Sequence, residues 1–342
     1  MNDFRDQRAR RSRGGEGETD MIGRRLLIAG GAAAFCAPWA GAQEIWPSKP
    51  IRIIAPVAPG GGVDLVARTI GDRLAQALGQ PVIVDNQSGG GGIIASQMTT
   101  RAAPDGYTLM VGYVGTHGTN PAVRKVPYDA INGFTPIAMV GGTPNILVVT
   151  PGLPVATVAE FVAYAKAHAG ELSYGTSGPG TLTHLAMEQF KEATGITLAH
   201  VPYRGITPAI FDVLAGHTHA MLPGLAAALP QINAGKLRPL AVTGARRHRL
   251  LPNVPTLEEL GYPGFDGVQW YGIVGPPGMP ADIVTRLNRE INAQLGAPEL
   301  AEKLSGEALD PMPMSPAEFG DYMKKDIAKW SAVVKARHLE ME

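Results

Sequence analysis

The fold is decided by the stretch that runs from Ile51-Arg-Ile-Ile-Ala55 into Pro56-Val-Ala-Pro-Gly-Gly-Gly-Val-Asp64. Its first part is a short β-branched run, which predicts a buried strand. Proline and three glycines then end the strand. Apolar residues at helical spacing follow from Val63 to Leu78, and they predict a helix that Gly79 terminates.

The glycine loop between this strand and this helix predicts an anion site. Glycines allow several backbone N–H groups to approach one point, and the N-terminus of a helix adds partial positive charge. A carboxylate is the simplest ligand for such a loop. Asp64 lies in the first turn, where it either caps the helix or holds the loop. An ordinary tight turn is the alternative interpretation.

The alternation of strand and helix continues along the chain. Strands are expected at 82–84 and 107–111, with a helix at 93–100 between them. This order is typical of a parallel, doubly wound sheet. The pattern then restarts at Thr157 and Glu160, which form a capping box at the start of another helix.

The sequence therefore predicts an α/β protein with two lobes, each a sheet flanked by helices. Residues 43–142 are expected to form the first part of lobe 1 and residues 143–268 to form lobe 2. Residues 269–342 contain two helices with apolar stripes and are expected to return to lobe 1, because a chain that crosses twice makes a hinge. No internal repeat of 20–50 residues is visible, which argues against a solenoid.

Composition excludes several classes of protein. The 342 residues carry 30 Lys and Arg against 30 Asp and Glu, so the formal net charge is zero. A nucleic-acid binder would be expected to show a basic excess. Hydrophobic residues make up 45% of the chain, which argues against disorder and suffices for a packed core.

The N-terminus predicts export. Arg24 and Arg25 precede an apolar run, Leu26 to Ala37, and Ala40-Gly-Ala42 completes the pattern of a signal peptide. The run is too short for a spanning helix, which needs roughly 20 apolar residues. Residues 1–42 are thus expected to be an N-terminal extension and a signal peptide, cleaved after Ala42. The paired arginines are compatible with the Sec or the Tat route, and both lead to the periplasm.

Two further expectations concern this leader. Translation is expected to start at Met21, because a polar extension ahead of a signal serves no evident purpose. The single cysteine, Cys36, lies inside the leader and follows the bulky Phe35, which argues against lipidation. The exported chain would then contain no cysteine, no disulfide and no catalytic thiol.

The segment Tyr174-Gly-Thr-Ser-Gly-Pro-Gly-Thr-Leu-Thr-His184 predicts a second ligand loop. Hydroxyl groups and glycines lie there between a strand and a helix. Ser177 and His184 suggest a serine hydrolase as an alternative, but no acid partner is evident and Pro179 occupies the place of the second glycine of a nucleophile elbow. A polar loop that hydrogen-bonds a ligand is the preferred interpretation.

Other motifs are weaker. Gly90 to Ala95 fits a dinucleotide fingerprint, but the acid expected about 20 residues later is missing. His217 and His219 lack a third ligand at metal spacing. Arg246-Arg-His-Arg249 is a basic run that is more typical of a solvated loop, although a membrane partner could dock there.

Ordered motifs over nearly the whole exported chain resemble the Bug (TctC-like) periplasmic solute-binding receptors of tripartite tricarboxylate transporters. The motifs that carry the resemblance are these: Pro59-Gly60-Gly61 with Asp64, Pro104-Asp-Gly-Tyr-Thr108, Thr116-His117 with Asn120-Pro121, Tyr128-Asp129, Phe134-Thr-Pro-Ile137, Tyr174-Gly175 with Gly180-Thr181 and His184, Val201-Pro-Tyr-Arg-Gly205, Leu229-Pro with Ala234-Gly-Lys236, Leu251-Pro-x-Val-Pro255 and Gly275-Pro-Pro-Gly278.

The resemblance implies a Venus-flytrap receptor that closes on a small organic acid and delivers it to membrane permease subunits, with no catalysis, cofactor, metal or nucleic acid, and as a monomer. Sensing for a sensor kinase is the alternative role. The resemblance also implies that several loops converge on one cleft. The expected ligand-binding residues are Ala58, Pro59, Gly60, Gly61, Gly62, Asp64, Thr116, His117, Asn120, Thr176, Ser177, Gly180, Thr181, His184, Tyr203, Arg204 and Gly205.

The sequence departs from the family pattern at two positions. Pro223 stands where many relatives carry an Asp, and Ser88 stands where a Pro commonly precedes Gly89. The first change removes a charge near the expected cleft, which leaves open a ligand other than the family's familiar dicarboxylates.

Overall fold

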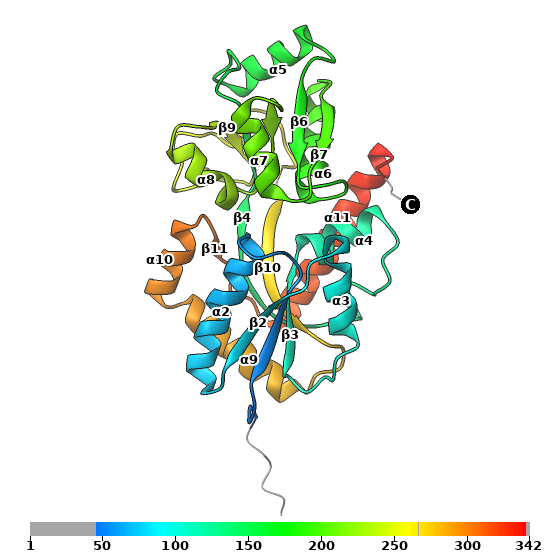
Figure 1. Ribbon diagram of the computed structural model, residues 1–342, viewed down its shortest axis with the longest axis vertical. Coiled ribbons are helices and arrows are strands. Elements are labelled where there is room, and N and C mark those ends of the chain that lie inside the picture. The colour runs from blue at the N-terminus through cyan, green and yellow to red at the C-terminus, as the bar shows by residue number, and fades with distance from the viewer. Residues whose placement is uncertain (1–45, 266, 340–342) are drawn as a thin grey trace, which may run out of the picture. The chain divides into compact units, whose positions relative to one another are not determined.

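A computed structural model describes residues 46–265 and 267–339 (Figure 1). The predicted signal peptide and its cleavage point lie outside these residues. Within them, no helix combines the length and the apolar character that crossing a membrane requires.

The first sheet has six strands in the order β11-β4-β10-β3-β1-β2. Its strands are β1 (Ile51–Ala55), β2 (Val82–Asn86), β3 (Thr108–Tyr113), β4 (Thr135–Pro144), β10 (Val268–Gly275) and β11 (Asp310–Pro311). β1 pairs in parallel with β2 and β3, whereas β10 runs antiparallel to both β3 and β4. The parallel arrangement expected from the strands at 51–55, 82–84 and 107–111 is therefore confirmed, and the antiparallel pairs of β10 and β11 make the sheet as a whole mixed.

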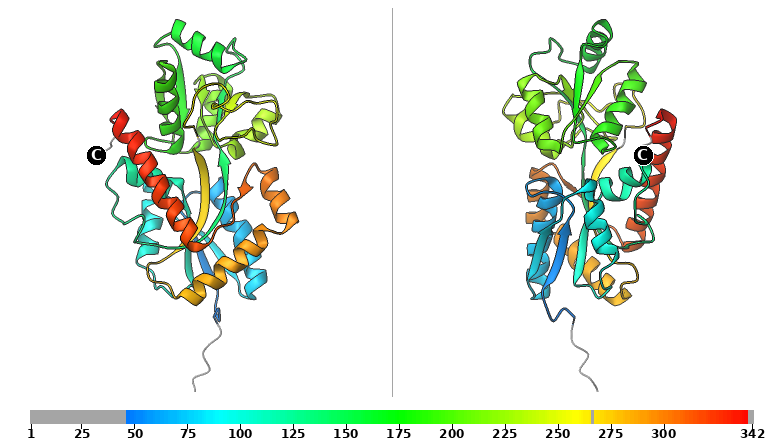
Figure 2. Two further views of the ribbon diagram at one scale, coloured as in Figure 1. Left: turned by 180° about the vertical axis from the view of Figure 1, so that it is seen from behind. Right: turned by 45° about the vertical axis from the view of Figure 1, so that its right-hand side comes forward.

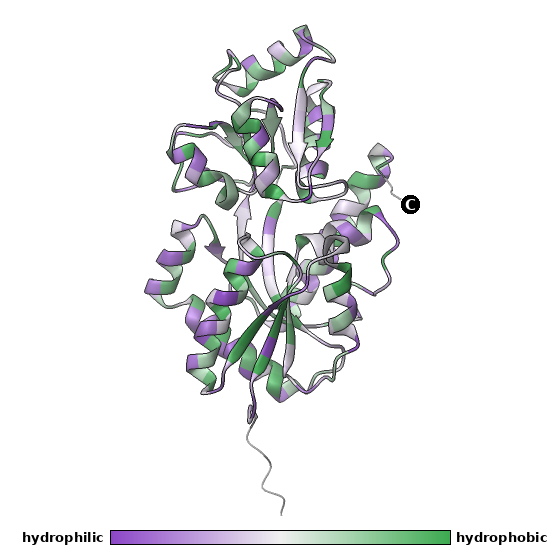
Figure 3. Cartoon of the chain, in the orientation of Figure 1, coloured by the Kyte–Doolittle hydropathy of each residue, from purple (hydrophilic) through white to green (hydrophobic). Residues whose placement is uncertain are grey.

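Helices cover both faces of the first sheet. They are α2 (Gly62–Leu78), α3 (Ile93–Thr100), α4 (Asn120–Val123), α9 (Ala281–Leu295), α10 (Pro298–Gly306) and α11 (Pro316–Arg337). Ile53 of β1 packs in one apolar cluster with α2 and α9, and the next residue, Ile54, packs in another with α3 and α11. Successive side chains of a strand point to opposite faces, so a strand buried on both sides reads as a continuous apolar run. Figure 3 shows much of the lower part of this sheet in green, whereas the helices around it alternate between purple and green.

The second sheet has five strands in the order β7-β6-β8-β5-β9. Its strands are β5 (Ile146–Val149), β6 (Ser173–Thr176), β7 (Ala199–Pro202), β8 (Ala220–Met221) and β9 (Arg238–Val242), and its helices are α5 (Val158–Ala167), α6 (Leu182–Thr194), α7 (Ile206–Ala215) and α8 (Leu225–Asn233). β6 pairs in parallel with β7 and β8, and β5 pairs antiparallel with β8 and β9. This sheet is also mixed rather than parallel.

We call the first sheet with its helices lobe 1 and the second sheet with its helices lobe 2. The chain passes from β4 into β5 and returns from β9 to β10. In Figure 2, α11 extends from the first sheet to lobe 2, where Leu182 of α6 packs in the same apolar cluster as Trp330 of α11. The exact lobe limits expected at residues 142 and 268 stay a prediction.

The structure confirms the helix ends predicted from local sequence signals. α2 ends at Leu78, and Gly79 follows it with φ +69°, a left-handed conformation that glycine adopts at little cost. Thr157 with Glu160, and Ser315 with Glu318, form the expected capping boxes of α5 and α11.

Candidate ligand-binding site

The glycine loop after β1 is held by the carboxylate of Asp64. Its Oδ2 accepts the backbone N–H of Gly60 at 3.0 Å, and its Oδ1 accepts Asn86 Nδ2 at 2.9 Å. Arg68 reaches both oxygens of the same carboxylate, with Nη2 at 3.0 Å from Oδ1 and Nε at 3.1 Å from Oδ2. Asp64 therefore holds the loop, which is one of the two roles considered for it.

Burial by itself would raise the pKa of Asp64, because only 6% of the residue is exposed. The hydrogen bonds from Arg68, Asn86 and Gly60 outweigh that effect, and the pKa of Asp64 lies below its usual value. The carboxylate therefore stays charged and keeps the loop fixed around it.

The same loop leaves the first amides of α2 without side-chain partners. Gly61 is the N-cap residue and makes no side-chain cap hydrogen bond. The first N–H groups of a helix have no acceptor within the helix, so they are available to an anion. Gly62 is required by packing, since a Cβ there would lie 2.4 Å from Tyr271 Oη. Ala58 and Pro59 are exposed.

Three loops of lobe 1 meet at Thr116. A Cβ on Gly92 would lie 2.5 Å from Thr116 Cγ2 and 3.2 Å from Pro56 Cβ, so only glycine permits this approach. Asn120 Nδ2 donates to Gly91 O at 2.8 Å, and Tyr128 Oη donates to Thr116 O at 2.9 Å. The glycine run 89–92 thus supports the loop after β3.

His117 lies in the protein interior. It is 0% exposed, its Nδ1 is 2.8 Å from Thr116 Oγ1, and its ring packs edge-on against Phe134 with centroids 4.4 Å apart. Burial lowers the pKa of His117 to about 3, so the imidazole is neutral. Thr116 and Asn120 are buried too. The assignment of these three side chains as ligand contacts remains a prediction.

The predicted loop of lobe 2 is organised by its own hydroxyl groups. Thr176 Oγ1 lies 2.7 Å from His200 Nε2 and accepts the N–H of Gly178 at 3.2 Å. Thr181 Oγ1 donates to Gly178 O at 2.7 Å. Gly178 and Gly180 have φ of +128° and +72°, which a side chain would disfavour.

Ser177 and His184 do not bond to each other in this arrangement. Ser177 Oγ lies 3.0 Å from Thr183 Oγ1, and His184 Nδ1 accepts the N–H of Gly180 at 3.2 Å. The ring of His184 stacks on His200 with centroids 4.2 Å apart. The geometry thus gives Ser177 and His184 roles in holding the loop, and no nucleophile–base pair forms here.

Burial lowers the pKa of both stacked histidines. The pKa of His200 falls to about 4, mainly through burial and also through the neighbouring His184. The pKa of His184 is lowered as well, because burial outweighs the attraction of Glu188. Both rings are therefore neutral near pH 7 and present hydrogen-bonding nitrogens rather than charges.

The third predicted segment, Tyr203 to Gly205, lies beside the second. Tyr203 N–H donates to Thr176 O at 3.0 Å, and Tyr203 Oη donates to Asp212 Oδ2 at 2.5 Å. Gly205 is the N-cap of α7, has φ +134° and makes no side-chain cap hydrogen bond. Arg204 is exposed.

One contact between the lobes was missed by the sequence analysis. Arg124, which follows α4 in lobe 1, donates from Nη2 to Pro179 O in the lobe 2 loop at 3.2 Å. Arg124 stands just beyond the predicted segment 116–120, but nothing in its local pattern indicates a partner 55 residues away. Asn86 and His200 were missed for the same reason. His217 and His219 have separate partners, Asp212 and Ser173.

The parallel strands direct the predicted loops toward one another. In Figure 1, β1 runs from the outer end of lobe 1 toward lobe 2, and β6 runs from the α5 end of lobe 2 toward lobe 1. Their carboxyl ends carry the loops that begin at Pro56 and Ser177. Ligands of α/β sheets bind outside the carboxyl ends of strands.

A sequence model described as tripartite tricarboxylate transporter family receptor matches residues 66–339. The chain belongs to this receptor family. Among relatives, Protein BugT of Bordetella pertussis (strain Tohama I) is 33% identical over 321 residues, which cover 92% of this chain and 95% of BugT. The resemblance noted from the motifs is thereby confirmed.

Solved structures of the receptor family show the same fold. R. palustris Rpa4515 with adipate is 37% identical with a TM-score of 0.82, covering 86% of this chain and 98% of that one. MatC (Rpa3494) from Rhodopseudomonas palustris with bound malate is 30% identical with a TM-score of 0.78, covering 84% and 100%. The predicted two-lobed periplasmic-binding-protein fold is confirmed.

Proposed function

We propose that this protein is an extracytoplasmic receptor that binds a small organic carboxylate between its lobes and delivers it to a tripartite tricarboxylate transporter. One observation carries the proposal. Three helices, α2, α6 and α7, begin after the carboxyl ends of parallel strands and have no capping side chain. They come from both lobes. Adipate and malate in two related structures support a carboxylate as the ligand class.

The uncapped helix starts account for affinity without a buried cation. An anion near a helix N-terminus gains about 0.3–1 kcal/mol per helix, and more when it is partly buried. The contact between Thr176 and His200 fixes the loop ahead of α6, and a fixed polar loop can set the orientation of a ligand. A ligand that contacts both lobes favours their closed arrangement over an open one.

The ligand is identified by a thermal-shift screen of the purified protein. Mono-, di- and tricarboxylates, aromatic acids and amino acids are tested, and the denatured protein is searched for a co-purified acid by mass spectrometry. Ligand at 100 times its Kd should stabilise the fold by about 2.7 kcal/mol. If no acid stabilises the protein and none is released from it, the proposal fails.

Replacing Asp64 with Asn should weaken binding of the identified acid about tenfold or more. The variant removes the charge that holds the N–H of Gly60, and charged hydrogen bonds contribute about 1.5–3 kcal/mol. Asp72→Asn, an exposed position on the same helix, is the matched control and should bind as the natural protein does. Equal affinity of both variants, measured by calorimetry, would show that Asp64 does not order the loop for the ligand.

We also propose export to the periplasm with cleavage after Ala42. Family membership and the signal pattern of residues 24–42 support this. The intact mass of the protein recovered from the periplasm should correspond to a chain that starts at Gln43. Recovery of the uncleaved chain from the cytoplasm contradicts export.

Delivery to the transporter is tested separately. Deletion of the gene for this protein should abolish uptake of the identified acid by the cell.

A further inference from the structure

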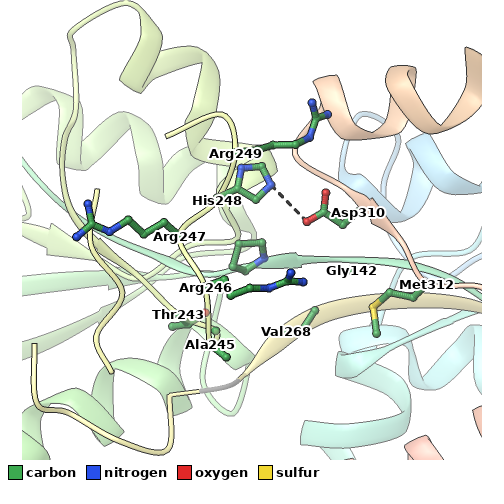
Figure 4. A pocket seen from close by; sticks show the side chains of 12 residues that line it. Gly142, Thr243, Ala245, Arg246, Arg247, His248, Arg249, Val268, Asp310 and Met312 are labelled. Carbon is green, nitrogen blue, oxygen red and sulfur yellow. Dashed lines mark ion pairs between the residues drawn. The ribbon is translucent and has the colours of Figure 1, made fainter. Parts of the chain in front are cut away.

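A hollow of about 560 Å³ is lined by none of the residues of the predicted ligand loops described above. Its lining comes from the loop after β9 in lobe 2 and from strands β4, β10 and β11 of lobe 1 (Figure 4). Volumes of about 300–1,000 Å³ are typical of small-molecule sites. The size therefore fits a small molecule.

Residues 246–249, the basic run of the sequence, form one wall of this hollow. Arg247 is already neutralised, since its Nε lies 2.8 Å from Glu259 Oε2 and its Nη1 donates to Pro252 O at 3.2 Å. Figure 4 shows Arg247 turned away from Arg246 and Arg249. Among the described residues, neither Arg246 nor Arg249 has an ion-pair or hydrogen-bond partner, and both are exposed.

His248 adds a buried polar atom to the same wall. It is 4% exposed, and its Nδ1 accepts the N–H of Leu250 at 3.3 Å. Its Nε2 is buried and has no hydrogen-bond partner within the described residues. Asp310 Oδ2 lies 3.6 Å from Nε2, an ion-pair contact that is too long for a hydrogen bond. A buried nitrogen without a hydrogen-bond partner is rare in native proteins.

The opposite wall is apolar. Val268 and Met312 line it, and the backbone of Gly142 approaches both closely, because a Cβ there would lie 2.3 Å from Val268 Cγ1 and 3.1 Å from Met312 Sδ. Asp310 is the one acidic side chain among the described residues that line the hollow. The hollow is lined by three arginines and one carboxylate. Because Arg247 is paired with Glu259, two arginines face one carboxylate, and the lining keeps a net positive charge.

We propose that this hollow is a second binding site, for a small organic acid whose carboxylate pairs with Arg246 and Arg249 and whose apolar body packs against Val268 and Met312. A guanidinium recognises a carboxylate through parallel N–H bonds, and the apolar wall favours an organic anion over an inorganic one. The site shares no residue with the loops at 58–64, 116–120, 176–184 and 203–205, so it stands independently of the proposed receptor function.

Benzoate is a suitable probe, and backbone amide NMR of the full exported protein is a suitable readout. Saturable shifts are expected for Gly244 and Ala245, two residues of the hollow. The double variant Arg246→Gln/Arg249→Gln should weaken this binding about tenfold or more, because it removes the charged hydrogen bonds. Shifts at Gly60 and Gly178 report the ligand loops separately, so the two sites are distinguished in one titration.

The matched control is Arg101→Gln/Lys236→Gln, which removes two exposed cations elsewhere and should leave benzoate binding unchanged. Non-saturating shifts at Gly244 and Ala245 overturn the proposal. An equal loss of benzoate affinity in the control double variant also overturns the proposal, because the effect would then arise from net charge alone. Phosphate that binds this site as tightly as benzoate overturns the assignment of an organic acid.

Discussion

Replacing Asp326 with Ala is expected to lower the free energy of unfolding by about 4 kcal/mol. Asp326 lies on α11 and is 9% exposed. Its Oδ2 accepts Trp270 Nε1 from β10 at 2.8 Å, and its Oδ1 accepts Trp330 Nε1 at 3.0 Å. The variant leaves two buried indole N–H groups without an acceptor, and each costs about 1–3 kcal/mol.

Urea unfolding followed by tryptophan fluorescence measures this loss. Asp326→Asn retains the shape but offers one oxygen for two donors, so about half of the destabilisation should remain. The matched control is Asp321→Ala on the same helix, whose carboxylate forms an exposed pair with Lys324 and should contribute less than about 1 kcal/mol. Equal stability of the Asp326 and Asp321 variants would contradict the role assigned to this carboxylate.

Asp326 also explains how α11 supports the segment 115–119, part of which is predicted to contact the ligand. A Cβ on Gly118 would lie 2.5 Å from Asp326 Oδ2, so the segment 115–119 rests against this carboxylate. The hydrogen bond from Trp270 joins β10 to Asp326 of α11, whereas Trp330 lies on α11 itself. α11 in turn backs the loop that follows β3. Removal of the Asp326 carboxylate is therefore expected to loosen the segment that contains Thr116 and His117.

Lowering the pH from 8 to 4 is expected to remove about 3 kcal/mol of stability through His117 alone. The unfolded chain binds a proton at this imidazole below about pH 6.5, whereas burial holds the folded pKa at about 3. Between pH 8 and pH 4 the folded state therefore scarcely binds a proton at His117. The unfolded state does bind it, and this binding stabilises the unfolded state. The stabilising contribution is complete above pH 6.5 and is lost as the pH falls toward 3.

The measurement compares urea unfolding of the natural protein and of His117→Gln at several pH values. The variant is less stable at pH 8, because it disturbs packing against Phe134, but its stability should fall by about 3 kcal/mol less between pH 8 and pH 4. Other buried histidines, such as His200, contribute equally to both proteins and cancel. Parallel stability curves for the two proteins would mean that His117 already carries its proton in the fold.

Much of the local structure follows from the sequence, because it depends on neighbouring residues. The end of α2 at Gly79 requires a left-handed residue, and only glycine adopts that conformation freely. The capping boxes at Thr157 and Ser315 close hydrogen bonds within three residues. The loop at 58–61 between β1 and α2 was likewise predictable, since a strand, a glycine run and a helix start follow one another.

Strand order and burial were decided by the tertiary structure. β10 inserts antiparallel between β3 and β4, and no local period encodes which strand lies beside it. The family resemblance implied His117 as a ligand contact, whereas its burial depends on packing against Phe134, 17 residues away in the chain. Arg124 meets Pro179 only because the lobes bring them together. Periodicity and capping act over a few residues, whereas these contacts join segments far apart in the chain, and only the folded packing determines them.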